Sequence, residues 1–158
     1  MSTDRIPITP EGYKKLQEEL HRMKTVERPK VIKMIEYARS LGDISENAEY
    51  ETAKDRQSFV EGRIQELESR VARAEIIDPS TLSNKDRVMF GIRVTIEEIE
   101  TGNTTTYQLV GPDESEPENG KISVTSPIGR ALLGKQEEDE VRVQTPSGIR
   151  EFVVLKIE

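Results

Sequence analysis

Two acidic residues, Asp43 and Glu46, stand three positions apart in a short polar stretch between two long segments of helical spacing. Hydrolysis of a phosphodiester by two metal ions about 4 Å apart requires an in-line water and neutralised charge on the phosphoryl oxygens. Mg²⁺ commonly takes only one or two protein carboxylates and keeps several water ligands. One pair of acids cannot build such a site alone. It can complete a site on another molecule by holding a second Mg²⁺ and orienting its water.

The same pair has a purely structural interpretation. Asp43 can be the N-cap of the following helix, with Glu46 as its N3 partner in a variant of the capping box. Acidic residues are also favoured in any first helical turn by the helix dipole. The two interpretations are compatible, because a capped turn is a stiffer turn.

Three basic residues, Arg39, Lys54 and Arg56, flank the acidic pair. Cations in such a position can bind the phosphates of a single-stranded nucleic acid without reading its bases. Charged residues on a helix are also commonly a solvated face, and this alternative stays open. The nearby Tyr37 and Tyr50 could stack on a base or close the narrow end of the helical pair.

The segment before the acids is predicted to be a helix with Thr9 as its N-cap and Pro10 in the first helical position. Its apolar residues recur with steps of three and four, as in a coiled-coil seam. The seam comprises Tyr13, Leu16, Leu20, Met23, Val31, Ile35, Ala38 and Leu41. Pro29 lacks an N–H group and clashes with the preceding turn, so a kink or stutter is predicted there.

The segment after the acids, from about Glu46 to Ala74, is predicted to be a second helix. Its apolar stripe is Ala53, Val60, Ile64, Leu67, Val71 and Ala74. Gly42 is expected to end the first helix, and the turn is so short that the two helices must fold back as an antiparallel hairpin. Roughly thirty residues of helix would hold the acidic turn about 45 Å from the hairpin base.

The composition limits the chemistry that the chain can perform. The 158 residues contain no cysteine, which excludes disulfides, thiolate metal sites and cysteine nucleophiles. The single histidine, His21, argues against a histidine-based triad or zinc site. No apolar run approaches the length of a membrane span and no secretory signal is visible, so a cytoplasmic location without a membrane partner is expected. We also expect a monomer.

Charge is unevenly distributed along the chain. Residues 1–74 hold 14 basic and 14 acidic side chains, whereas residues 75–158 hold 9 and 16. An acidic field repels phosphates, so the first half is the better candidate for contact with nucleic acid.

The second half is predicted to be a small α+β globule. Residues 78–84 have the composition of a linker, which separates a domain at residues 1–77 from one at residues 85–158. Alternating apolar residues and turn signals predict strands at residues 93–99, 104–110, 121–124, 140–144 and 149–157. One short helix is predicted between Ser126, its N-cap, and Gly134, with Pro127 in the first helical position. An antiparallel sheet with one helix on a face follows.

Two blocks of the sequence resemble known signatures. The stretches ARSLGDISENAEY at residues 38–50 and SPIGRALLGK at residues 126–135 are similar to those of the bacterial transcript-cleavage factors of the GreA/GreB family. The order and spacing of the blocks match over nearly the whole chain. The resemblance implies an N-terminal antiparallel coiled coil and a C-terminal domain similar to the FK506-binding-protein fold.

The resemblance also implies a function. Such transcription elongation factors dock on the rim of the secondary channel of bacterial RNA polymerase and insert the coiled coil into it. The acids at the tip then help the polymerase's own active centre to cleave backtracked nascent RNA. The chain would therefore be an accessory factor and not an enzyme. It would have no cofactor of its own, and Mg²⁺ would be held jointly with the polymerase.

The resemblance assigns roles to particular residues. The family's tip acids correspond to Asp43 and Glu46, its basic residues facing the 3′ segment of the RNA to Arg39, Lys54 and Arg56, and its polymerase-docking loop to Ser126 and Pro127. The departures are mild. Ser45 stands where the family often has lysine, and Asp55 interrupts the basic group.

Three other functions stay open. An inhibitor on the same scaffold would occupy the channel and bind metal unproductively, but such paralogues tend to carry extra tip acids where this chain has Gly42 and Ser45. A prolyl isomerase would need an aromatic-lined pocket, for which residues 85–158 offer only Phe90, Tyr107 and Phe152. A plain coiled-coil adaptor would leave RNA uncleaved in an assay with stalled polymerase.

Overall fold

The computed structural model describes residues 4–43, 47–81 and 86–158. The chain forms two compact units, a helical unit (Tyr13–Arg73) and a globular unit (Met1–Gly12 with Ala74–Glu158). The globular unit therefore includes the N-terminal segment as well as the second half of the chain. Within the described ranges, no helix combines the length and the apolar character that crossing a membrane requires.

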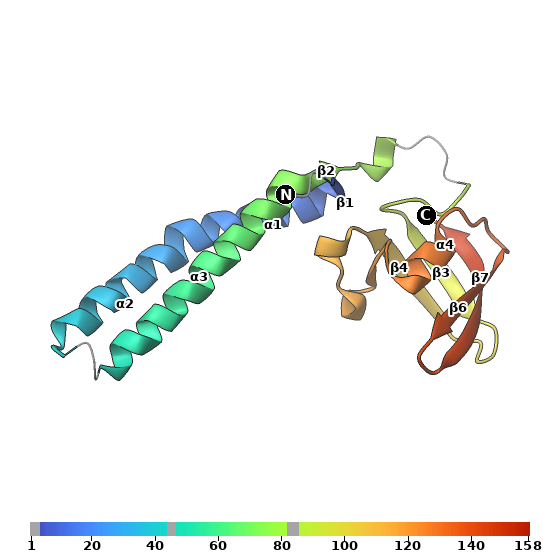
Figure 1. Ribbon diagram of the computed structural model, residues 1–158. Coiled ribbons are helices and arrows are strands. Elements are labelled where there is room, and N and C mark those ends of the chain that lie inside the picture. Colours follow the sequence, from blue (N-terminus) through green and yellow to red (C-terminus); the bar gives the residue numbers. More distant parts are fainter. Residues whose placement is uncertain (1–3, 44–46, 82–85) are drawn as a thin grey trace. The chain divides into compact units, whose positions relative to one another are not determined.

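A long helical hairpin is the main feature of the first half of the chain (Figure 1). Helix α1 (Pro10–Arg22), the π-helical turn η1 (Met23–Glu27) and helix α2 (Arg28–Ser40) follow one another without a break as the first arm, and helix α3 (Ala48–Arg73) is the second arm. Most of the predicted apolar stripe is buried: Leu16, Met23, Val31, Ile35, Ala38, Ala53, Val60, Ile64 and Leu67. The predicted hairpin is confirmed.

The last residues of each predicted apolar stripe are not buried as expected. Leu41 is 50% exposed, because α2 ends at Ser40 and Leu41 already belongs to the turn. At the other end, Val71 is only partly buried, and Ala74 begins strand β2 (Ala74–Ile76) and does not continue the helix.

The irregularity predicted at Pro29 lies in the turn that precedes it. In a regular α-helix the proline ring would clash with the carbonyl group four residues earlier. That carbonyl belongs to Thr25, which lies in the middle of the π-helical turn η1. The hydroxyl of Thr25 donates a hydrogen bond of 2.8 Å to the carbonyl oxygen of His21. The wider turn lets the first arm pass Pro29 without ending.

Ion pairs connect the two arms. The Arg28 guanidinium donates two hydrogen bonds to the Glu61 carboxylate, at 2.9 and 2.8 Å, and thereby lowers the pKa of that carboxyl. Arg63 of α3 pairs with Glu19 of α1 at 2.8 Å. Exposed pairs add little stability one by one. Their positions nevertheless oppose a shift of one arm along the other, because a shift would separate each charge from its partner.

The globular unit contains two sheets. Strand β1 (Ile6–Ile8) pairs in parallel with β2, which directly follows α3. The larger sheet has five strands in the order β5-β4-β3-β7-β6. They are β3 (Arg93–Glu98), β4 (Thr104–Val110), β5 (Lys121–Ser123), β6 (Glu140–Thr145) and β7 (Gly148–Ile157).

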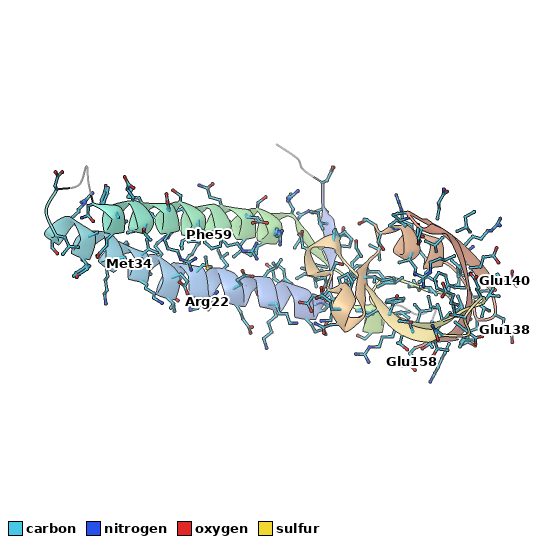
Figure 2. All side chains as sticks on the ribbon, turned by 90° about the horizontal axis from the view of Figure 1, so that it is seen from below. Arg22, Met34, Phe59, Glu138, Glu140 and Glu158 are labelled. Carbon is cyan, nitrogen blue, oxygen red and sulfur yellow. The ribbon has the colours of Figure 1, made fainter. Side chains whose placement is uncertain are left out.

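Helix α4 (Pro127–Leu132) lies against this sheet (Figure 1). Its Leu132 joins the inward-facing strand residues in one buried core: Val88, Val94, Ile96, Leu109, Ile122, Leu132, Val141, Val143, Phe152 and Val154. Acidic side chains such as Glu138 and Glu140 are exposed on the surface of the same unit (Figure 2). The three short turns η3 (Pro79–Thr81), η4 (Pro112–Glu114) and η5 (Pro117–Asn119) are 3₁₀-helical.

The predicted α+β class is confirmed, as are the five strands and the short helix, with strand ends that differ by one residue at most. The expectation of an antiparallel sheet is wrong for one pair of strands. Strand β5 runs parallel to β4, with Gln108 opposite Lys121, because the turns η4 and η5 between them carry the chain back before β5 begins. The small β1–β2 sheet was not predicted. The likeness to the FK506-binding-protein fold stays a prediction.

Candidate functional site

The acidic turn begins where α2 ends. The backbone N–H of Leu41 donates to the carbonyl oxygen of Ala38, and that of Gly42 donates to Arg39, which closes the last helical turn. Gly42 has a φ of +111°, a conformation that glycine adopts without strain. Gly42 thus ends the first arm as predicted. Asp43 follows it with an exposed side chain, at the end of the hairpin where the two arms meet. Glu46, the second predicted acid, lies outside the described residues.

The second arm begins with a different cap from the one predicted. Helix α3 starts at Ala48, and the side-chain oxygen of Asn47 accepts a hydrogen bond of 3.1 Å from the backbone N–H of Tyr50. The side-chain amide of Asn47 also donates to the carbonyl oxygen of Ala38 at 2.5 Å. The interpretation of Asp43 as the N-cap of this helix is therefore wrong, since Asn47 is the residue that caps it.

The predicted basic residues have separate surroundings. Arg39 is exposed in the last turn of α2. Lys54 donates a hydrogen bond of 2.8 Å to Gln57 on its own helix. Arg56 lies 3.5 Å from the Glu27 carboxylate of η1, and its guanidinium stacks over the ring of Phe59 at 4.9 Å. Arg56 is thus partly neutralised by a carboxylate of the other arm.

A small hollow lies on the hairpin beside the tip. It has a volume of about 280 Å³ and is lined by Met34, Tyr37, Ala48, Glu49, Thr52 and Ala53. Tyr37 is 62% exposed, so it does not close the end of the hairpin. In Figure 2, Met34 and Phe59 project from α2 and α3, respectively. Aromatic and thioether side chains are therefore accessible near the acidic turn.

The second predicted site lies on the globular unit. The hydroxyl of Ser126 accepts a hydrogen bond of 3.1 Å from the Gly129 N–H and donates one of 2.6 Å to the Ser123 carbonyl oxygen. Pro127 occupies the first position of α4. The predicted cap is confirmed, and it fixes the start of α4 against the end of β5.

Ser126 and Pro127 line an open groove of about 370 Å³. Its walls are mainly apolar and include Tyr107, Ile122, Ile128, Val143, Pro146 and Phe152. Arg150 also lines it, stacks over Phe152 at 5.1 Å and donates a hydrogen bond to Glu98, which lowers the pKa of the Glu98 carboxyl. The groove thus has a mainly apolar lining, and the Arg150 guanidinium on its wall is already paired with Glu98.

Comparison with known proteins matches both halves of this arrangement. Residues 6–76 match the N-terminal domain of transcription elongation factors, as defined for GreA and GreB, and residues 83–158 match the C-terminal domain of GreA/GreB transcription elongation factors. The chain belongs to the GreA/GreB family. The expectation drawn from the two sequence blocks is confirmed at the level of the family.

Several relatives of this GreA/GreB chain are similar over almost their entire length. The transcription elongation factor GreA of Syntrophobacter fumaroxidans is 54% identical over 153 residues, which are 97% of each chain. That of Verminephrobacter eiseniae is 53% identical over 152 residues, or 96% of each chain. The crystal structure of GreA factor homolog 1 of Thermus thermophilus is 29% identical, covers 98% of this chain and 99% of its own, and gives a TM-score of 0.44.

The described residues of the tip offer few ligands for a metal ion. Among the residues that the structure describes, no group of three or more histidine and acidic side chains is placed to hold a metal ion. The exposed carboxylate of Asp43 is an oxygen ligand of the kind that Mg²⁺ prefers. Because Mg²⁺ commonly takes only one or two protein carboxylates, the donor set at the tip fits an ion whose other ligands come from elsewhere.

Proposed function

We propose that this elongation factor binds bacterial RNA polymerase and stimulates the polymerase's own endonucleolytic cleavage of backtracked nascent RNA. It acts as an accessory factor and not as a nuclease. The observation that supports this most is the position of Asp43: its exposed side chain directly follows Gly42, the glycine that ends α2, at the far end of the helical hairpin. An exposed carboxylate at the end of a long hairpin can reach a metal ion bound to another molecule.

The hairpin inserts into the secondary channel of the polymerase. Helix α3 has 26 residues and is therefore about 39 Å long. The buried stripe and the ion pairs between the arms, such as Arg28 with Glu61, stiffen this rod. A stiff rod delivers its tip with less loss of conformational entropy than a flexible loop would.

Asp43 and Glu46 then act at the polymerase active centre. Together with the polymerase they would hold a second Mg²⁺, which when bound supplies an activated water and offsets charge on the phosphoryl oxygens. Asp43 holds its carboxylate at the tip because Gly42 ends α2 and the Asn47 side chain ties the start of α3 to Ala38. The proposed contribution of the chain is therefore a positioned pair of anionic oxygens.

Arg39, Lys54 and Arg56 contact the 3′ segment of the backtracked RNA. Each phosphate contact adds salt-dependent affinity without base specificity. For Arg56 this contact requires an exchange of partners, since its guanidinium lies 3.5 Å from the Glu27 carboxylate. Exposed ion pairs of this kind contribute about 0–1 kcal/mol, so an RNA phosphate can compete with Glu27.

The groove beside α4 docks the globular unit on the rim of the channel. Ser126 and Pro127, predicted as docking residues, lie on its wall next to apolar side chains such as Ile128. Burial of an apolar groove supplies binding energy that does not depend on the tip. Docking and chemistry are thus assigned to different units. We place the factor in the cytoplasm as a monomer.

The experiment that tests this function uses halted, backtracked transcription complexes. Addition of the purified protein with Mg²⁺ should shorten the nascent RNA from its 3′ end and let the complexes resume elongation, whereas the protein alone should leave free RNA intact. Inhibition of elongation without cleavage would identify a channel-occupying inhibitor. Cleavage of free RNA by the wild type, but not by an Asp43→Ala variant, would show that the accessory-factor proposal is wrong.

A further inference from the structure

The Glu27 carboxylate lies between two guanidinium groups of the helical unit. Its Oε1 accepts a hydrogen bond of 2.8 Å from Arg22, the last residue of α1, and its Oε2 lies 3.5 Å from the guanidinium of Arg56 in α3. Arg22 belongs to the first arm of the hairpin, and Phe59, three positions after Arg56, lies on the second arm (Figure 2). The side chain of Glu27 is only 14% exposed, whereas that of Arg56 is 44% exposed. One mostly buried anion therefore serves a cation from each arm.

The π-helical turn η1 brings Glu27 to this position. Glu27 is its last residue, and Arg28, which follows, pairs with Glu61 of α3 at 2.8 Å. Consecutive residues of a helix point about 100° apart, so the two side chains reach α3 at different points. The contact of Glu27 with Arg56 is therefore part of the pairing of the two arms, and its position depends on the wide turn that precedes Pro29.

Arg56 differs in this respect from the other two cations near the tip. Its guanidinium lies beside Glu27 and also stacks at 4.9 Å over the ring of Phe59, about one turn further along the same face of α3. Lys54 donates instead to a neutral side chain of its own helix, and Arg39 is exposed at the end of α2. A carboxylate of the hairpin therefore already competes for Arg56 before any RNA arrives.

The two cations bind Glu27 unequally. Arg22 lies 2.8 Å from the carboxylate and Arg56 lies 3.5 Å from it, so Arg56 is the more loosely held partner. A buried carboxylate that loses its cation is strongly destabilising, because its charge is left uncompensated. Glu27 would keep Arg22 if a phosphate drew Arg56 away. Arg56 can therefore change partners without leaving a buried charge uncompensated.

We propose that Glu27 is a positioning residue that makes Arg56 a conditional contact for RNA phosphates. In the absence of RNA the guanidinium is occupied, and an isolated phosphate gains little by displacing a carboxylate from it. When Arg39 and Lys54 already hold phosphates of a strand, the next phosphate is present at a high effective concentration and takes Arg56 from Glu27. The hairpin therefore favours a threaded strand over free phosphates. The identity of that strand as backtracked RNA rests on the function proposed above.

Nuclear magnetic resonance of the isotope-labelled protein can follow the side-chain N–H of Arg56 directly, and an Arg56→Gln variant identifies its signal. Inorganic phosphate should shift this signal in Glu27→Gln but not in the wild type. A uridine oligomer of about ten nucleotides should shift it in both proteins. Its affinity should be about threefold higher for Glu27→Gln, a gain within the range of an exposed ion pair. Equal shifts of the Arg56 signal by inorganic phosphate in both proteins would overturn the proposal, as would equal affinities for the oligomer.

A double-variant cycle separates the release of Arg56 from the loss of a negative charge. In an Arg56→Gln background, Glu27→Gln should change the affinity for the oligomer by less than about 1.5-fold. Glu66→Gln removes the same charge further along α3, from pairs with Arg63 at 3.1 Å and Arg70 at 2.5 Å, and should have an equally small effect. A gain in either control as large as that of Glu27→Gln alone would overturn the proposal, because a weaker negative field would explain it. Circular dichroism checks the helix content of each variant.

Stimulated cleavage in the presence of competitor RNA provides the second measurement. The same oligomer, added free to halted, backtracked complexes, should inhibit Glu27→Gln at a concentration about threefold lower than it inhibits the wild type, because the variant binds free RNA more readily. Glu66→Gln should be inhibited like the wild type. Equal inhibition of Glu27→Gln and the wild type would overturn the proposal. If the wild type failed to stimulate cleavage at all, the proposed function would fall, while the Arg56 signal would still decide whether Glu27 controls that residue.

Discussion

The side-chain amide of Asn47 donates a hydrogen bond of 2.5 Å to the carbonyl oxygen of Ala38, nine residues earlier, and so joins the two arms of the hairpin beside Asp43. That carbonyl lies in the last turn of α2, where intrahelical donors run out. The same side chain caps α3 through its oxygen. One residue therefore forms a hydrogen bond at each of the two helix ends at the tip and limits the movement of the turn that bears the acid.

Asn47→Ala should weaken both functions of this residue. Loss of the cap and of the bond between the arms should lower the free energy of unfolding by about 1–2 kcal/mol, measured by urea denaturation followed by circular dichroism. Stimulated cleavage should fall because Asp43 is held less firmly. Asn47→Asp is the matched comparison, since it keeps the capping oxygen but replaces the donor to Ala38 with a carboxylate oxygen that the Ala38 carbonyl repels. If Asn47→Ala cleaved as fast as the wild type, the tip would not need this anchor.

The basic residues near the tip predict a dependence on the length of the backtracked RNA. Changing Arg39, Lys54 and Arg56 together to glutamine should slow cleavage of long backtracks more than of short ones, because a longer extruded segment offers more phosphates. The difference in cleavage rate between the triple variant and the wild type should shrink at high salt, because salt screens the contacts with phosphates. The control changes Lys14 and Lys15, exposed lysines near the other end of the first arm, to glutamine. If the triple variant cleaved long backtracks as fast as the wild type, these three residues would be a solvated helix face that does not contact the RNA.

The ion pair between Arg28 and Glu61 predicts a dependence of hairpin stability on pH. The guanidinium lowers the pKa of Glu61 in the folded chain, so the pair stabilises the fold above the ordinary glutamate pKa of about 4.3, and this stabilisation is lost as the pH falls through the lower folded value. The difference in unfolding free energy between the wild type and Glu61→Gln should therefore be larger at pH 7 than at about pH 3. Glu18→Gln, whose carboxylate lies 4.0 Å from Lys14, serves as a control. A pH-independent difference for Glu61→Gln would rule out the ion pair as its cause.

The groove on the globular unit predicts a variant that docks poorly. Ile128→Ser should weaken binding to RNA polymerase about tenfold or more, because Ile128 lines the apolar groove beside Ser126 and Pro127. Ile149→Ser is the control, since Ile149 is an exposed isoleucine of β7 that does not line this groove. Thermal unfolding of both variants would show that each is folded. If the two variants bound RNA polymerase equally well, the docking surface would have to lie outside this groove.

Local chemistry made much of this fold predictable. Gly42 ends α2, Pro29 disturbs the turn before it, and Ser126 with Pro127 starts α4, because each of these residues constrains its own backbone. The β4–β5 pairing was not predictable, since the direction of the short strand β5 depends on the two turns that precede it.

The candidate site was predictable in its residue types but not in its internal arrangement. Asp43 and Asn47 are both good N-caps, and only the structure shows that α3 starts at Ala48 with Asn47 as its cap. The second bond of Asn47, to the Ala38 carbonyl oxygen, is a contact that only the folded hairpin creates. Likewise, no local pattern could show that Arg56 pairs with Glu27 or that Glu114 reaches back to Thr9, because these partners are 29 and 105 positions apart.

The central claim is that the Asp43 carboxylate acts in the chemistry on RNA and not in docking or folding. The most direct test compares Asp43→Asn with the wild type in halted, backtracked complexes, with polymerase affinity and cleavage rate at saturating protein measured on the same preparations. Because Asn47, and not Asp43, caps α3, the account predicts an affinity within about twofold of the wild type and a cleavage rate lower by about a hundredfold or more. Unchanged cleavage, or a loss of affinity that accounts for the whole loss of cleavage, would contradict it.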